Sequence, residues 1–252
     1  MTFATYRSSL EAVHTLLAKR LPRKNTRIYE AGGGSTSFIQ LNFLEDARIT
    51  VVDIDEVQLK NNHYAEHKIL GDIQTHAFPP NSFELIVCYN VIEHLTAPDQ
   101  AIAQFFEALS PGGLLVIGAP NPNSFSGWVT RLTPHWFHVW YYRFILGDRL
   151  AGQPGHVPFP TVFHPLVTPG KLIDFSQNLG FRVIHFQEYE GEQYERIKYQ
   201  SPVLGTFVKV IVGLANAATL WQRDLRKGDF HIVLEKTARR RLIKHEHGAP
   251  HV

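Results

Sequence analysis

The chain has 252 residues, of which 44% are hydrophobic and 19% are charged, and its 25 Lys and Arg nearly balance its 23 Asp and Glu. This length and apolar content suit one α/β domain with a substantial core, and the balanced charge gives no broad basic surface for nucleic acid. The single cysteine, Cys88, excludes an internal disulfide, and its apolar surroundings predict a buried thiol.

Apolar residues at helical spacing open the chain, and strands then alternate with helices. Residues 5–21 predict an amphipathic helix with Leu10, Val13, Leu17 and Leu21 on one side. We predict strands near 26–30, 48–53, 67–70, 83–89 and 113–119, and helices near 36–44, 55–63 and 98–109. This alternation is typical of a parallel sheet with right-handed crossovers, which binds ligands at the carboxyl ends of its strands.

A glycine loop follows the first predicted strand. Residues 28–31 form a short run that contains Glu30, and residues 32–34 are all glycine. A second apolar run ends at Asp53, about 20 residues further on, which is the spacing at which a carboxylate can accept hydrogen bonds from ribose hydroxyls. Together the two features predict a bound adenosine-containing cofactor.

Charge at the loop distinguishes between cofactors. Loops that bind dinucleotides commonly follow G-x-G-x-x-G and place backbone N–H groups against a pyrophosphate. Here Ser35, Thr36 and Ser37 follow the glycines, and Glu30 lies at the mouth of the loop. A carboxylate would repel a pyrophosphate but would attract the ammonium and sulfonium groups of S-adenosylmethionine. The loop therefore favours the methyl donor, although a glycine turn also has a purely steric use.

Three later segments complete a recognisable pattern. Residues 71–73 read Gly-Asp-Ile, residues 83–95 run from an apolar strand into Glu-His-Leu, and residues 110–121 carry a Pro-Gly-Gly turn before another apolar run. In this order they resemble the class I S-adenosylmethionine-dependent methyltransferases over residues 26–121. The likeness returns at 168–183 and at 230–236, which look like the helix before strand six, that strand, and the last strand of the family.

The resemblance implies a doubly wound, mostly parallel seven-stranded sheet of Rossmann-like type. It also implies which residues hold S-adenosyl-L-methionine. Those at the methionine end are Glu30, Gly32, Gly34 and Asn90; Asp53 would hold the ribose, and Ile54, Asp72 and Ile73 would contact the adenine. Three positions depart from the family pattern, because Glu30 replaces an aspartate, Gly33 a cysteine or other small residue, and Thr36 the last glycine of the loop.

The region 122–167 differs in composition from the rest of the chain. It is rich in Trp, Phe, Tyr and His among many Pro and Gly residues, and it follows the fifth predicted strand at the cofactor edge. We interpret it as a substrate lid that covers an apolar or aromatic acceptor and excludes water. The alternative is an insertion that packs on a small core of its own.

The chain contains 14 histidines, but their spacing matches no zinc ligand set, and we expect no metal. His94 follows the fourth predicted strand, and His135 and His138 lie in the lid. These three are the candidates for a general base, and the alternative for each is a hydrogen-bonded structural role.

A second apolar segment spans residues 201–221. It is too short and too interrupted to span a membrane, so we predict a helix that covers the sheet between the last two strands; the alternatives are an interfacial membrane helix and a dimer face. Residues 238–252 predict a basic, flexible tail. Charged residues in 11–19 interrupt any signal-peptide pattern, which predicts a cytoplasmic protein, peripheral to the membrane at most.

These features predict a single domain over residues 1–237 that transfers a methyl group from S-adenosyl-L-methionine to oxygen, nitrogen or carbon of a small, apolar or aromatic acceptor. In-line attack at the sulfonium methyl requires chiefly that the acceptor be held within about 3–3.5 Å. Two alternatives remain open at this point. One is a nicotinamide-dependent oxidoreductase on the same fold, and the other is a non-catalytic membrane- or partner-docking protein that kept the fold.

Overall fold

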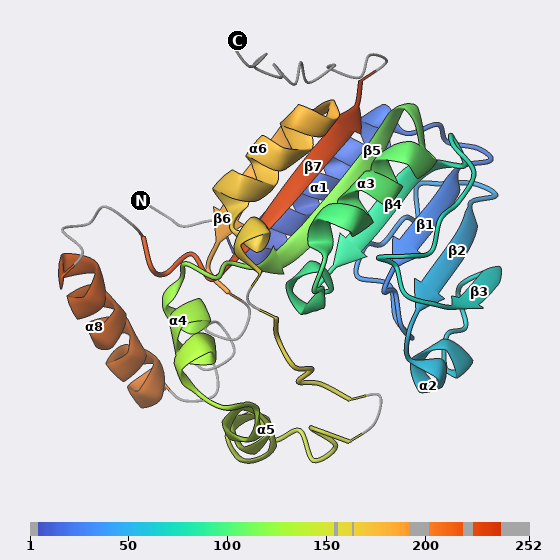
Figure 1. Ribbon diagram of the computed structural model, residues 1–252. Helices are drawn as coiled ribbons and strands as arrows, with labels where there is room; N and C mark the ends of the chain where they lie inside the picture. Colours follow the sequence, from blue (N-terminus) through green and yellow to red (C-terminus); the bar gives the residue numbers. More distant parts are fainter. Residues whose placement is uncertain (1–4, 154–155, 163, 192–201, 219–223, 238–252) are drawn as a thin grey trace, which may run out of the picture.

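The computed structural model describes residues 5–153, 156–162, 164–191, 202–218 and 224–237, and it contains a seven-stranded sheet (Figure 1). The strands are β1 Arg27–Ala31, β2 Arg48–Asp53, β3 His67–Leu70, β4 Phe83–Tyr89, β5 Leu109–Pro120, β6 Phe181–Tyr189 and β7 Asp229–Lys236. Their order in the sheet is β3-β2-β1-β4-β5-β7-β6, and β7 runs antiparallel to both of its neighbours. The doubly wound, mostly parallel sheet is therefore confirmed.

The sheet reverses its direction of winding between β1 and β4. The chain proceeds from β1 outward to β2 and β3, and it then returns to place β4 beside β1. Ligands of open α/β sheets bind outside the carboxyl ends of the strands at such a switch point. The predicted cofactor residues lie in the last residues of β1 and β2 or follow β1, β2, β3 and β4, so the topology brings them to this one edge.

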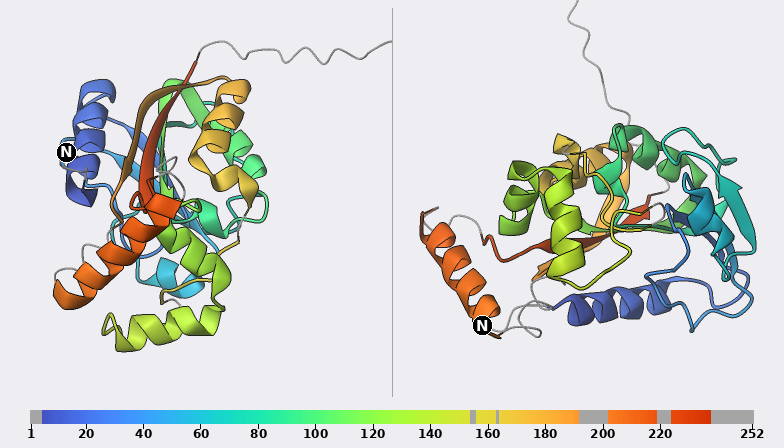
Figure 2. Two further views of the ribbon diagram at one scale, coloured as in Figure 1. Left: turned by 90° about the vertical axis from the view of Figure 1, so that its left-hand side faces the viewer. Right: turned by 90° about the horizontal axis from the view of Figure 1, so that it is seen from below.

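Helices cover both faces of the sheet. α3 (Pro98–Ala108) and α6 (Pro169–Leu179) pack on one face, and α1 (Tyr6–Arg20) packs on the other (Figure 2, left). Val13 and Leu17 of α1 are fully buried, as the helical spacing predicts. Burial of such a side chain contributes about 1.5–3 kcal/mol, so these contacts hold α1 against the sheet.

The first crossover differs from the prediction. No helix forms over residues 36–44, which adopt turns and irregular backbone. Ser37 gives a physical reason, because its hydroxyl donates to both the Glu30 carboxylate and the Ile39 carbonyl and so competes with helical backbone bonds. The second predicted helix is shorter than expected, since α2 spans only Glu56–Lys60.

The aromatic region forms two helices and an extended segment beyond the carboxyl ends of the parallel strands (Figure 1). α4 spans Phe125–Leu132 and α5 spans His135–Phe144. The chain then returns through irregular backbone and enters a short 3₁₀ turn, η2 (Pro165–Val167). On the way it passes another short 3₁₀ turn, η1 (Ile92–His94), which follows β4. No residue of α5 is buried, so the helix does not form a compact core of its own.

α8, which spans Pro202–Ala218, does not cover the sheet. It projects beyond the sheet edge, near α4, in Figures 1 and 2. Val210 and Leu214 of this helix are 54% and 67% exposed. The sheet-covering prediction for 201–221 is therefore wrong for the residues that the structure describes. No described helix is long and apolar enough to cross a membrane.

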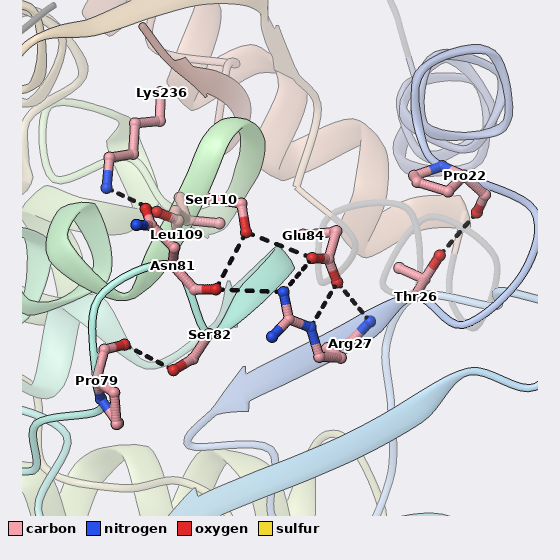
Figure 3. A network of polar contacts seen from close by, with 10 residues as sticks. All are labelled: Pro22, Thr26, Arg27, Pro79, Asn81, Ser82, Glu84, Leu109, Ser110 and Lys236. Atoms are coloured by element: carbon pink, nitrogen blue, oxygen red, sulfur yellow. Dashed lines mark hydrogen bonds and ion pairs between the residues drawn. The ribbon is translucent and has the colours of Figure 1, made fainter. Parts of the chain in front are cut away.

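A polar network joins the amino ends of β1, β4 and β5, opposite the predicted cofactor edge (Figure 3). The backbone N–H and Nε of Arg27 donate to Glu84 Oε2 at 2.8 and 3.2 Å, and Arg27 also bonds the Asn81 carbonyl. Burial disfavours the charged form of Glu84, but the Arg27 bonds outweigh it and hold the pKa of this carboxyl below its usual range. The network fixes the relative positions of the strands that carry the site.

Replacing Glu84 by glutamine is expected to lower the free energy of unfolding by about 1 kcal/mol at pH 7, because the pair is half exposed on its Arg27 side. The folded-state pKa of Glu84 is lowered, so its contribution is present above the unfolded pKa near 4.5 and is lost as the pH falls through the folded pKa. Urea unfolding at pH 7 and at decreasing pH measures both effects. Glu45→Gln, in a well-exposed pair with Lys24, is the control, and an equal loss in both variants would contradict the prediction.

Candidate functional site

The glycine loop follows β1 and requires glycine at two of its positions. Gly32 and Gly34 have φ angles of +68° and +51°, in the left-handed region. The Gly32 N–H donates to the Val52 carbonyl at 2.8 Å, and the Gly34 N–H donates to Asp53 Oδ2 at 2.9 Å. The loop is therefore held against the end of β2, where the second predicted carboxylate lies.

Glu30 is buried beneath this loop, with 3% of its surface exposed. Its carboxylate accepts from the Ser37 hydroxyl at 2.6 Å and from the Tyr64 hydroxyl at 2.7 Å. Burial raises the pKa of Glu30, and these two hydrogen bonds oppose the rise. Buried negative charge at this position is available to a cationic ligand group, which would in turn favour the ionised carboxylate.

Asp53 ends β2, and its two carboxylate oxygens have different partners. Oδ2 accepts from the Gly34 N–H, and Oδ1 accepts from the Asp55 N–H at 2.8 Å. Burial raises the pKa of Asp53, whereas the backbone bonds lower it. Each carboxylate oxygen can accept more than one hydrogen bond, so the Asp53 carboxylate retains capacity for ligand hydroxyls. Ile54, next in the chain, is 75% exposed and presents an apolar surface beside it.

The remaining predicted cofactor residues follow β3 and β4. Asp72 accepts from the backbone N–H and the side-chain amide of Gln74 at 2.9–3.1 Å. Ile73 is 4% exposed with its side chain in the core, so only its backbone can meet a ligand. Asn90 is exposed and has a φ of +54°, which turns the chain away from the end of β4. In the part of the chain that the structure describes, no hydrogen bond joins any two of these three residues.

Several residues that support the loop were not predicted. The Tyr64 hydroxyl also donates to the Gly33 carbonyl at 3.1 Å, Gln58 accepts from the Ser35 N–H, and the Asn62 side chain donates to the Gly34 carbonyl at 2.7 Å. All three lie in or after α2, far from the loop in sequence. No spacing rule identifies them, because they reach the loop only through the pairing of β1 with β2.

A small cavity lies behind the loop. Its lining includes Glu30, Gly33, Phe38 and Tyr89. The rings of Phe38 and Tyr89 stack with centroids 4.8 Å apart and 15° between their planes. The Phe38 ring, from the first crossover, therefore lies against Tyr89 at the end of β4, and both rings line the cavity beside the buried Glu30 carboxylate.

His94 links the scaffold to the aromatic region. Its Nδ1 lies 2.7 Å from the Pro160 carbonyl, and its ring packs edge-on against Phe159 at 6.1 Å between centroids. The Val162 N–H donates to the Glu93 carbonyl at 2.9 Å, which gives the same segment a second attachment. Because a carbonyl only accepts, Nδ1 carries the proton, and Nε2 of the neutral ring is left with a lone pair.

The environment of His94 keeps its ring neutral. Burial lowers the pKa of His94, and the bond to Pro160 opposes this only in part. Glu93 Oε1 lies 3.7 Å from His94 Nε2, while Glu93 Oε2 is buried without a hydrogen-bond partner in the part of the chain that the structure describes. Burial raises the pKa of Glu93 to about 8, so this carboxyl is mostly protonated at neutral pH. His94 is therefore equipped to accept a proton.

The two other candidate bases lie on α5. His135 is its exposed first residue, and His138 Nε2 lies 3.0 Å from the Thr133 hydroxyl, which places His138 in a local hydrogen bond. Among the described residues, neither histidine forms a hydrogen bond or a ring contact with His94. Nor do the described residues contain a cluster of three or more His, Cys, Asp and Glu side chains that could hold a metal ion.

Residues 29–117 match the family model of a methyltransferase domain. A protein of Mycolicibacterium smegmatis, named as a probable S-adenosylmethionine-dependent methyltransferase, is 30% identical over 133 residues, or 51% of this chain and 50% of that protein. An uncharacterised protein of Methanocaldococcus jannaschii is 29% identical over 114 residues, or 45% of this chain and 49% of that protein. The chain thus spans about half the length of these two relatives.

Solved structures share the fold. A SAM-dependent methyltransferase from Archaeoglobus fulgidus superposes with a TM-score of 0.54 at 18% identity, covering 92% of this chain and 96% of that one. A second, from Mesorhizobium loti, gives a TM-score of 0.53 at 15% identity and covers 88% of this chain and 96% of that one. The segment matched by the family model contains every residue predicted to hold the cofactor and ends before the aromatic region.

Proposed function

We propose that this chain, whose residues 29–117 match the methyltransferase family model, is a class I S-adenosylmethionine-dependent methyltransferase that transfers a methyl group to a small acceptor with an apolar or aromatic scaffold. The observation that carries the proposal is the pair of carboxylates, Glu30 and Asp53, on either side of a loop with two positive-φ glycines. The acceptor atom is oxygen, nitrogen or carbon, and the chemistry of the site suits all three.

The site residues fit S-adenosyl-L-methionine, the cofactor of this family. Buried Glu30 would face the positively charged methionine end, and Gly32 and Gly34 would let the backbone approach it. Asp53 would accept from the ribose hydroxyls, and exposed Ile54 would pack on the adenine. Asp72, the Ile73 backbone and Asn90 would complete the site. When bound, the cofactor supplies an electrophilic methyl group.

The chain's own contribution to the reaction is positioning, water exclusion and proton removal. The region 122–167 would act as a lid within the same domain, because its return segment is attached at Glu93 and His94 beside the site. The unprotonated Nε2 of His94 would accept a proton from the acceptor. Acceptors that ionise readily need little help from this base, whereas an alcohol needs more.

Calorimetric titration tests the cofactor assignment. Wild-type protein is expected to bind S-adenosylmethionine or S-adenosylhomocysteine but not NAD, and Asp53→Ala is expected to bind them more weakly by about 1.5–3 kcal/mol, the range for hydrogen bonds to a charged group. Asp174→Ala, an exposed acid on α6, is the control. Because Asp53 also supports the loop, thermal melting should accompany each titration. Equal binding by wild type and Asp53→Ala, or tight binding of NAD, would overturn the assignment.

A further inference from the structure

One face of α5 is an exposed aromatic stripe. Trp136, Trp140 and Phe144 follow one another at four-residue spacing and are 68%, 44% and 71% exposed. Residues four apart in a helix share a face, so the three rings lie in a row. Such a row of large apolar side chains in water is unfavourable unless another surface covers it.

Neighbouring helices add apolar side chains at the same end of the molecule. Leu132, the last residue of α4, is 82% exposed, and Trp128 one turn before it is 36% exposed. In α8, Val210 and Leu214 are also four residues apart and exposed. α4 and α5 lie beyond the carboxyl ends of the parallel strands, and α8 lies to the side of the sheet near α4 (Figures 1 and 2). We call α4, α5 and α8 together the apolar end.

The charge of the apolar end indicates what covers it. α4 and α5 contain two arginines, Arg131 and Arg143, and no acid, and residues 202–218 contain one lysine and no acid; Asp148 and Arg149 follow α5 in the chain. A second copy that met this face with its own would bring like charges together. An anionic bilayer offers the complementary charge and an apolar interior, and tryptophan with arginine is the combination that suits the headgroup boundary.

We propose that the apolar end docks on an anionic lipid bilayer, with Trp136, Trp140 and Phe144 of α5 inserted at the headgroup boundary. The segment that follows α5 is attached to His94 through the Pro160 carbonyl, so docking would hold the His94 side of the candidate site toward the lipid. The consequence for the substrate rests on the proposed methyl transfer: the acceptor is then an amphipathic molecule that enters from the lipid phase.

Vesicle sedimentation with the full chain tests the docking. We expect binding to phosphatidylcholine vesicles that contain about 30% phosphatidylglycerol, weak binding to pure phosphatidylcholine, and a decrease with salt. Trp136→Ser combined with Phe144→Ser should lower partitioning by at least about tenfold, and Arg149→Ala by about fivefold. Tryptophan emission should shift to the blue on binding, because three of the four tryptophans lie in α4 and α5.

Phe186→Ser is the matched control, because Phe186 is 41% exposed on the edge strand β6, outside the apolar end. Its partitioning should equal that of wild type. Absence of vesicle binding, or binding that the α5 substitutions leave unchanged, would overturn the proposal. So would a dimer, detected by light scattering, that Trp136→Ser dissociates. S-adenosylhomocysteine titration of the same samples separates the two hypotheses, since retained cofactor binding without docking leaves the methyl transfer intact.

Discussion

Replacing His94 by alanine is expected to lower turnover by about 10²–10⁴-fold while S-adenosylmethionine binding stays near the wild-type value, if the acceptor requires a base. The proton on Nδ1 is held by the Pro160 carbonyl, which leaves Nε2 to accept from the acceptor. Burial lowers the pKa of His94, so its neutral form predominates at pH 7. Steady-state kinetics together with cofactor titration measures the two quantities separately.

The pH dependence gives this prediction a second readout. Wild-type activity should fall as the pH falls through the His94 pKa, which lies below the ordinary value of 6.5, because the protonated ring cannot accept a proton. This acidic limb should vanish in His94→Ala. His94→Asn keeps a donor for the Pro160 carbonyl without a base, so it should be as slow as His94→Ala and thereby separate proton transfer from attachment of the Pro160 segment.

His135→Ala and His138→Ala are the comparison variants, because both residues lie on α5 away from the attached segment. Both should keep turnover within a few-fold of wild type. Loss of turnover in His135→Ala with retention in His94→Ala would move the base onto α5. Wild-type rates in all three would show that methyl transfer here depends on positioning alone, with the histidines in structural roles.

Replacing Gly32 by alanine is expected to destabilise the glycine loop more than a change at any other position discussed for that loop. An added Cβ would lie 2.5 and 2.7 Å from the two methyl carbons of Val91, and the φ of +68° is unfavourable for any L side chain. The left-handed backbone costs about 1–2 kcal/mol and the overlap about 1–3 kcal/mol. We expect a decrease of about 2–4 kcal/mol in the free energy of unfolding and at least a tenfold weaker affinity for S-adenosylhomocysteine.

Gly170→Ala is the matched control, since an added Cβ in this helical residue of α6 meets nothing within 4 Å. Its stability should equal or exceed that of wild type, because alanine is the better helix former. Adding Val91→Ala to Gly32→Ala removes the overlap but keeps the backbone strain. The double variant should therefore lose less free energy of unfolding than the two single variants lose together. An additive pair, or a Gly32→Ala protein of wild-type stability and affinity, would contradict the steric account.

Local patterns were enough to predict the parallel sheet and the sheet edge at which the candidate site residues lie. Each parallel strand is an apolar run with a turn signal after it, and a carboxylate or amide at the end of one strand shares its edge with the others. Glu30 and Asp53 could therefore be predicted to share one sheet edge before the strand order was known, and the family resemblance added Asp72 and Asn90 to the same candidate site. The glycine loop could also be recognised because a turn after a strand is a local pattern, and the family resemblance singled out Gly32 and Gly34, both of which have positive φ.

Long-range contacts decided the rest. The Tyr64 hydroxyl reaches Glu30 across 34 residues, and the Pro160 carbonyl, in the segment after α5, reaches His94 across 66 residues. Neither contact leaves a periodic signal, because each depends on which strands become neighbours and on where a long return segment lands. The failure of 36–44 to form a helix has a similar origin, since Ser37 gains a carboxylate partner only when Glu30 is buried beside it.

The position of α8 could not be predicted from its own sequence. Its composition suited a helix that covers the sheet, but α1, α3 and α6 already occupy the two faces of the sheet (Figures 1 and 2). An apolar helix is stabilised when another surface covers its apolar face. The sequence of that helix alone does not show whether other helices already cover the sheet. The residue sequence therefore determined the sheet and the edge at which the candidate site residues gather, whereas tertiary packing decided the support of Glu30, the attachment of His94 and the exposure of the apolar end.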